Sequence, residues 1–130
     1  MLPPDVYLAL FNQSPIGEYL LSPAEDPVIL AVNDTFLQAA GRTREQLVGQ
    51  RLFAAFAGDP TDSGDSGVDA LRSSLARVLQ TRQADALPLQ RYPISVSQPD
   101  GSVVFEERFW HAVSTPIFDP AGSLVCIAHR

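Results

Sequence analysis

The side chains best suited to chemistry in this chain are a few carboxylates, two histidines and one cysteine. Glu106 and Glu107 are adjacent carboxylates. Neighbouring residues of a strand point to opposite faces, so these two cannot act together on one substrate atom. We expect them to lie at a solvated strand end, in ion pairs with Arg91 or Arg108.

A second group of carboxylates is spaced loosely, like the ligands of a calcium loop. It lacks the acidic twelfth position and the flanking helices of an EF-hand, so we predict a solvated loop over residues 58–67. The chain has no Gly-x-Ser-x-Gly, no Walker loop and no His-x-x-x-His pair, so no metal site or catalytic motif is predicted. The group comprises Asp59, Asp62, Asp65 and Asp69.

Composition excludes several classes of protein. Nine basic residues, all arginine, face fifteen acidic ones, and a net charge of −6 argues against binding nucleic acid or an anionic membrane surface. One cysteine among 130 residues excludes an intrachain disulfide and a multi-cysteine zinc site. Without a secretory signal or a long apolar run, the sequence is expected to be cytoplasmic. The sequence stops at residues 128–130, within an apolar strand-like run and with no stop signal, which suggests that the natural chain continues; a terminal strand is the alternative.

Hydrophobic periodicity predicts the elements that must position these residues. We expect a short helix over residues 5–12 and a hairpin of strands 16–21 and 28–32. Asn33 is a good N-cap, and Gly41 can end the helix that follows in the left-handed conformation. Thr43 and Gln46 fit a capping box.

The second half of the chain predicts one long helix and three strands. After a short helical turn over residues 51–57, apolar residues from Val68 to Leu79 mark one face of a helix over residues 68–83. Strands are expected at 87–96, 103–118 and 124–129, with tight turns between them. The sequence therefore predicts an α+β fold, a five-stranded antiparallel sheet with short helices and one long helix on one face, plus an N-terminal helix.

Residues at the joints of this order resemble a PAS domain. The resemblance rests on Ser-Pro-Ile-Gly at 14–17, on Val-Asn-Asp-Thr-Phe at 32–36 and on the run from Gly41 to Gly49. It continues with Asp-Gly at 100–101, Phe-Trp at 109–110, Pro-Ile-Phe-Asp at 116–119 and Gly122. Gln-Arg-Tyr at 90–92 and Phe-Glu-Glu-Arg-Phe-Trp at 105–110 are similar to PAS domains of bacterial sensor histidine kinases.

This resemblance implies an N-terminal helical cap (residues 1–13) and a PAS sensor domain (residues 14–130). Such a domain catalyses nothing itself; it senses or relays a signal, usually as a homodimer, to a C-terminal effector, here a kinase domain. A bound ligand would act through its differential affinity for two arrangements of the domain. A ligand-free module used only for dimerisation and relay is the alternative, and an enzyme is a third hypothesis.

The resemblance also argues against two cofactors. Flavin photosensors of this fold need a reactive cysteine where this chain has Leu52, whereas Cys126 lies on the last expected strand. Haem-binding members use a histidine on or near the long helix, and residues 68–83 contain none. His111 and His129 lie on strands, and His129 is the only conceivable haem ligand. No cofactor is expected, and an unknown small ligand is possible.

Strand alternation and the family-like register predict which side chains face the helices. The inward set mixes large rings with polar tips, which suits a small, partly aromatic ligand with one or two polar handles. We predict a ligand pocket formed by Tyr19, Leu21, Phe36, Phe53, Phe56, Leu75, Tyr92, Ile94, Trp110, Ser114 and Ile127. Phe105, Phe109 and Val113 are expected on the outer sheet face, covered by Leu8 and Phe11 of the N-terminal helix or by a second copy.

Overall fold

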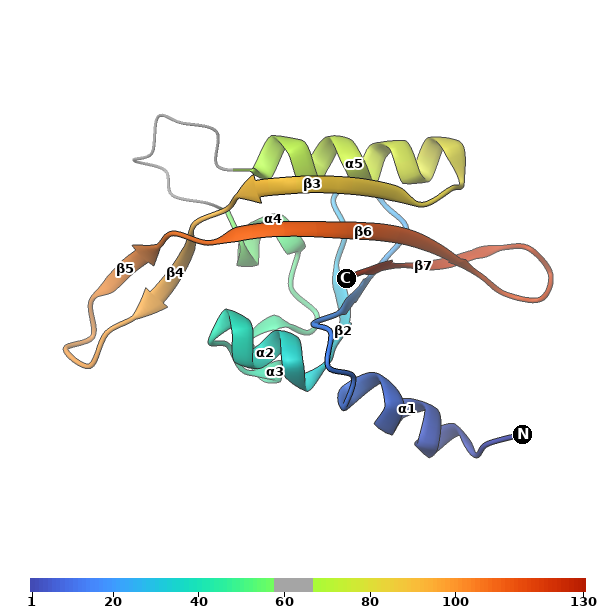
Figure 1. Cartoon of the computed structure of the whole chain (residues 1–130), viewed down its shortest axis with the longest axis horizontal. Coiled ribbons are helices and arrows are strands. Elements are labelled where there is room, and N and C mark those ends of the chain that lie inside the picture. Colours follow the sequence, from blue (N-terminus) through green and yellow to red (C-terminus); the bar gives the residue numbers. More distant parts are fainter. Residues whose placement is uncertain (58–66) are drawn as a thin grey trace.

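The structure, a computed structural model, describes residues 1–57 and 67–130. Five antiparallel strands form the main sheet in the order β2-β1-β7-β6-β3, and helices pack against it (Figure 1). The prediction of an α+β fold with a five-stranded antiparallel sheet is confirmed. Of the expected acidic loop, Asp59, Asp62 and Asp65 lie outside the described residues, and Asp69 lies in the first turn of α5. The strands are β1 (Tyr19–Leu21), β2 (Ile29–Val32), β3 (Asp85–Arg91), β6 (Phe109–Phe118) and β7 (Leu124–His129).

The first two helices between β2 and β3 have the caps that the sequence indicates. Asn33 caps α2 (Asp34–Ala40) by accepting a hydrogen bond from Phe36 N, and Gly41 ends that helix at φ 66°. Thr43 and Gln46 form the predicted capping box of α3. The three other elements on this side are α3 (Arg44–Leu47), α4 (Leu52–Ala55) and α5 (Val68–Thr81), the long helix.

The two long strands predicted over residues 87–96 and 103–118 are each broken in two. The outer halves, β4 (Ile94–Ser97) and β5 (Val103–Glu106), pair with each other as a separate two-stranded sheet. Pro93 lacks an N–H to continue the ladder, and Tyr92 N donates the bond at the break to Arg108 O (2.8 Å). Phe105 therefore lies on β5 and not on the outer face of β6, where the sequence analysis had placed it.

Ion pairs lie at the same break. Arg91 pairs with Glu107 and Arg108 with Glu106, all four partly exposed. The expectation that this carboxylate pair is solvated and ion-paired is confirmed. Arg42 fixes the β4–β5 hairpin from the helical side, where its guanidinium donates to Ser95 Oγ (2.6 Å) and Ser95 O (3.0 Å).

The N-terminal helix α1 (Pro4–Asn12) forms as predicted, but it covers no part of the sheet. It has no buried residue, Leu8 is 59% exposed, and the helix projects away from the domain (Figure 1). Its end is held from the helical side, because Thr35 Oγ1 of α2 donates to Ser14 O. The sequence analysis expected either this helix or a second copy of the chain to cover the outer sheet face. Within this chain, the helix does not cover it.

The core lies between the helices and the main sheet. Leu21 and Ile127 from the sheet belong to the same buried cluster as Leu75 and Val78 of α5, and all four are at most 1% exposed. In the described part of the chain, no helix is long and apolar enough to cross a membrane. The same residues contain no group of three histidine, cysteine or acidic side chains placed to hold a metal ion.

Candidate functional site

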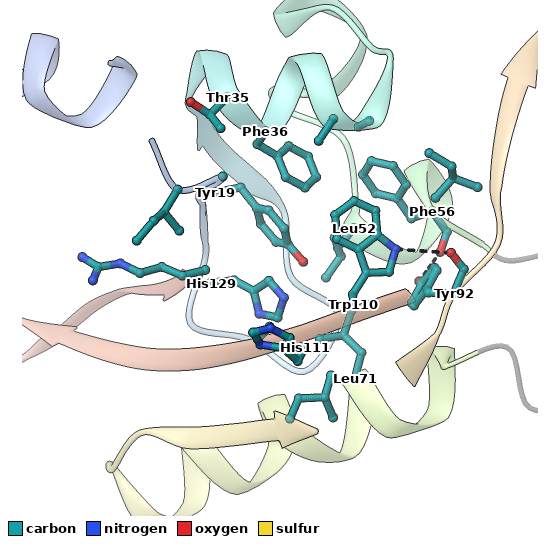
Figure 2. Close-up of a pocket in the computed structure, with 18 residues that line it drawn as sticks. Tyr19, Thr35, Phe36, Leu52, Phe56, Leu71, Tyr92, Trp110, His111 and His129 are labelled. Atoms are coloured by element: carbon teal, nitrogen blue, oxygen red, sulfur yellow. Dashed lines mark hydrogen bonds between the residues drawn. The ribbon is translucent and has the colours of Figure 1, made fainter. Parts of the chain in front are cut away.

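A cavity of about 270 Å³ lies between the helices and one end of the sheet. Figure 2 shows its wall, to which α2, α4, α5 and strands β1, β6 and β7 all contribute. Most of the exposed wall is carbon, and four aromatic rings form much of it. Phe36 is the centre of this ring cluster, with centroids 4.8 Å from Tyr19, 6.0 Å from Phe56 and 6.5 Å from Trp110.

Six of the eleven residues predicted for the pocket line this cavity: Tyr19, Phe36, Phe56, Tyr92, Ile94 and Trp110. The other five are in the interior without lining it. The register explains why: Tyr19 and His129 are opposed across β1 and β7, and Leu21 and Ile127 are the next inward pair along the same strands. These two lie under the helices, beyond the end of the cavity. The five residues placed away from the wall are Leu21, Phe53, Leu75, Ser114 and Ile127.

The sequence analysis missed twelve lining residues. His129 could have been predicted, because it is two residues from Ile127 on β7 and its side chain points to the same inner face. Ala112 follows from the alternation with Trp110. Leu52, Leu71 and the small helical residues depend on how the helices pack, which no local pattern encodes. The missed residues are Ile16, Gly17, Thr35, Ala39, Ala40, Leu52, Leu71, Leu87, His111, Ala112, His129 and Arg130.

One buried asparagine joins the two elements that carry Tyr19 and Phe36. Asn33 Oδ1 accepts hydrogen bonds from Phe36 N and Glu18 N, both at 2.9 Å, and Asn33 Nδ2 donates to Ile16 O (2.8 Å). These bonds replace strand pairing before Tyr19, which is why β1 is shorter than the strand predicted from residue 16. They fix the N-terminus of α2 against the start of β1.

Tyr92 and Trp110 are held at the opposite side of the cavity. The Tyr92 hydroxyl donates to Phe56 O at 2.5 Å, which ties the end of β3 to the end of α4. Trp110 Nε1 donates a long hydrogen bond to Tyr92 O (3.4 Å; Figure 2). Burial raises the pKa of the Tyr92 phenol, so its hydroxyl stays protonated and can donate.

His129 lies beside Tyr19, with ring centroids 4.7 Å apart. Its Nδ1 is 2.8 Å from Ser114 Oγ. Burial lowers the pKa of His129 to about 4, so the imidazole is neutral at pH 7. Burial, and then the charge that Tyr92 would carry if ionised, hold the pKa of Tyr19 well above its ordinary value.

Serine and histidine are also the residue types of nucleophilic catalysis. Ser114 is fully buried and is not on the cavity wall. Its one side-chain hydrogen bond among the described residues is with His129 Nδ1. A nucleophile has to reach its substrate, so this pair is a structural hydrogen bond rather than a catalytic one.

Two residues bear on the expectation that no covalent flavin is bound. Leu52, which the resemblance aligns with the reactive cysteine of flavin photosensors, lies on the cavity wall. Cys126, the only cysteine of the chain, is buried but does not line the cavity. A flavin–thiol adduct therefore has no nucleophile on this wall.

Comparison with known proteins rests on structure. No family model matches the sequence, and no curated protein matches it. An RNA-binding Light-Oxygen-Voltage receptor is similar over 99% of this chain, with a TM-score of 0.58 and 18% identity. The chain spans 33% of that receptor's length.

Two separate PAS domains are similar over most of their own length. The PAS domain of a Colwellia psychrerythraea protein matches 96% of this chain and 91% of that chain, with a TM-score of 0.58 and 14% identity. The Drosophila melanogaster Cycle PAS-B domain, with bound ethylene glycol, matches 88% of this chain and 96% of that chain, also with a TM-score of 0.58 and 14% identity. These likenesses identify the fold of the chain as PAS-like.

Proposed function

We propose that this chain is a sensory module that binds a small organic molecule in the cavity between its helices and sheet. The observation that carries the proposal is the aromatic cavity of about 270 Å³, lined by residues from both layers of the fold. A ligand there contacts α2, α4 and the sheet at once. Its binding would therefore favour one arrangement of the helices over another, which is what signal relay requires.

A thermal-shift screen of small metabolites tests this proposal. We expect at least one compound to raise the melting temperature of the wild-type chain. Ala112→Leu is the matched variant, because Ala112 is a buried residue of the wall and a larger side chain there fills the cavity. The variant should keep its circular dichroism spectrum and lose the response. If no compound stabilises the wild type, the sensing proposal is wrong.

We further propose that the module belongs to a bacterial sensor histidine kinase and precedes an effector domain. The support is the resemblance of residues 90–92 and 105–110 to that group. Tyr92 and Trp110, which end these two runs, form one wall of the cavity and are joined by a hydrogen bond. Sequencing the full-length gene beyond Arg130 tests the assignment: a helix leading to a phosphoacceptor histidine supports it, and any other effector contradicts it.

A second candidate function is dimerisation and relay without a ligand. The observation that favours it is the outer face of β6, where Phe109, Val113 and Ile117 recur at every fourth position and are 40–59% exposed. Apolar side chains gathered on one sheet face are typical of an interface. We propose a homodimer through this face, and the two functions are compatible with each other.

A further inference from the structure

Two polar atoms on the cavity wall have no protein partner. Among the described residues, the Tyr19 hydroxyl makes no hydrogen bond, and neither does Nε2 of His129, whose other ring nitrogen is bonded to Ser114. Tyr19 is 6% and His129 9% exposed. No fully buried polar side-chain atom of the described residues lacks a partner, so these two atoms must be open to space. The space that both residues line is the cavity.

The hydrogen bond to Ser114 determines which tautomer of His129 is present, and so which group it presents to the cavity. The Ser114 hydroxyl is fully buried, and His129 Nδ1 is its only hydrogen-bond partner in the described part of the chain. A buried hydroxyl hydrogen without an acceptor is costly, so Ser114 donates and Nδ1 accepts. A neutral imidazole carries its one hydrogen on the other nitrogen, and His129 therefore presents an Nε2–H donor.

The cavity is rich in donors and has no full charge in its interior. Besides Nε2–H, the Tyr19 O–H is directed toward Leu52 and Trp110 in Figure 2, and the Trp110 N–H makes only a 3.4 Å bond. The two remaining lining residues that can carry charge, Arg130 and His111, are exposed to solvent. Arg130 is also paired with Glu18 at 3.3 Å. An anion in the interior would lose its hydration without gaining a counter-charge.

Volume and wall shape limit the ligand further. An engineered apolar cavity of ~150 Å³ holds benzene, so this one has room for roughly one or two fused rings. Flat rings pack well against the edges and faces of the aromatic side chains of the wall.

We infer that the ligand is an uncharged aromatic carbonyl compound of one or two rings, whose carbonyl oxygen accepts hydrogen bonds from Tyr19 Oη and His129 Nε2. This inference rests on the proposed sensing function and adds the chemical class of the ligand. It also names the two residues that would set specificity, both of which are contributed by the paired strands β1 and β7.

Three probes of nearly equal shape test the inference. They are 2-acetylnaphthalene, the hydrocarbon 2-isopropenylnaphthalene, in which CH2 replaces the carbonyl oxygen, and the anion 2-naphthoate. Dissociation constants are measured by NMR titration of the wild-type chain. We expect the ketone to bind roughly tenfold more tightly than the hydrocarbon, because the hydrocarbon leaves both donors unpaired. The naphthoate should bind more weakly than the ketone.

Two tyrosine variants test whether the Tyr19 hydroxyl causes the preference for ketone over hydrocarbon. Tyr19→Phe removes a hydroxyl that has no protein partner, so it should leave the fold intact and reduce the preference for ketone over hydrocarbon to about threefold or less. Tyr7→Phe is the control, since Tyr7 lies on α1, is 52% exposed and does not line the cavity. It should keep the wild-type preference.

Other outcomes overturn the inference in distinguishable ways. If the naphthoate binds most tightly, or if ketone and hydrocarbon bind equally, the ligand class is wrong although the cavity binds small molecules. If none of the three probes binds, the inference also fails. The metabolite screen with Ala112→Leu then decides whether the sensing proposal fails with it.

Discussion

Tyr19 and His129 stand directly opposite each other on β1 and β7, and their rings are in contact with centroids 4.7 Å apart. Antiparallel register alone brings them together from positions 110 residues apart in the chain. Both rings are buried, and each has one polar atom that no described residue satisfies. A fold that leaves two such atoms on one cavity wall is suited to a partner that completes their hydrogen bonds.

Removing the hydroxyl should lower the free energy of unfolding at Tyr92 but not at Tyr19. Tyr92→Phe leaves the buried Phe56 carbonyl without its donor, so we expect a loss of about 1–2 kcal/mol in the free energy of unfolding. Tyr19→Phe removes only an unpaired hydroxyl and should be neutral or slightly stabilising in the ligand-free chain. Urea unfolding of both variants checks this. A larger loss for Tyr19→Phe than for Tyr92→Phe would show that its hydroxyl has a protein partner.

The stability of the domain should fall between pH 6.5 and about 4. Burial lowers the pKa of His129 from 6.5 to about 4, so in this range the unfolded chain binds a proton that the folded chain does not. The contribution is complete above pH 6.5 and declines as the pH falls, by about 3 kcal/mol in total. Asp85, whose pKa is lowered by hydrogen bonds from Arg77 and Ser74, loses its own contribution only below this window.

Replacing each histidine in turn isolates this effect. His129→Gln cannot titrate, so its free energy of unfolding should be nearly flat from pH 6.5 to 4.5. His111→Gln replaces the other histidine of the chain, which is exposed, and is measured beside it as the matched comparison. Denaturant unfolding at several pH values gives the comparison. A slope that survives His129→Gln would assign the titration to another group.

Asn33 should be among the most sensitive positions outside the apolar core. Asn33→Ala removes a helix cap and leaves Glu18 N and Ile16 O without their side-chain partner, so we expect a loss of about 2–4 kcal/mol. Thr43→Ala removes the exposed cap of α3 and should cost about 1 kcal/mol. Equal losses at the two caps would mean that Asn33 acts only as a cap and does not join α2 to β1.

The proposed dimer predicts a change of mass on mutation of the outer sheet face. Phe109→Glu places a charge within the apolar set on β6 and should convert a dimer to a monomer in light scattering. Val48→Glu is the control, because Val48 is also exposed (38%) but follows α3 on the helical side. An unchanged mass for Phe109→Glu would show that copies of the chain do not meet through this face.

Local sequence signals predicted most helices and strands correctly. Long-range packing accounts for the differences between the predicted and the observed structure. Caps at Asn33 and Thr43 and the left-handed Gly41 depend on side-chain chemistry within a few residues, and all three are as expected. The breaks in the long strands were missed because Pro93 was taken as part of a strand although it cannot donate to the ladder. The cavity wall was predicted in part. Alternation identifies inward side chains, but only the packing of the helices decides which of these meet a cavity rather than another side chain.

The central claim is that a small molecule occupies the cavity between helices and sheet. Trp110 is the only tryptophan of the chain and lies on the cavity wall, so its indole N–H gives a single resolved NMR signal from the site. Titration of the isotope-labelled protein with 2-acetylnaphthalene is the most direct test. We predict a saturable shift of the Trp110 signal, together with shifts at Tyr19 and His129. A Trp110 signal that stays in place up to the solubility limit of the compound, or that moves equally in Ala112→Leu, would contradict the account.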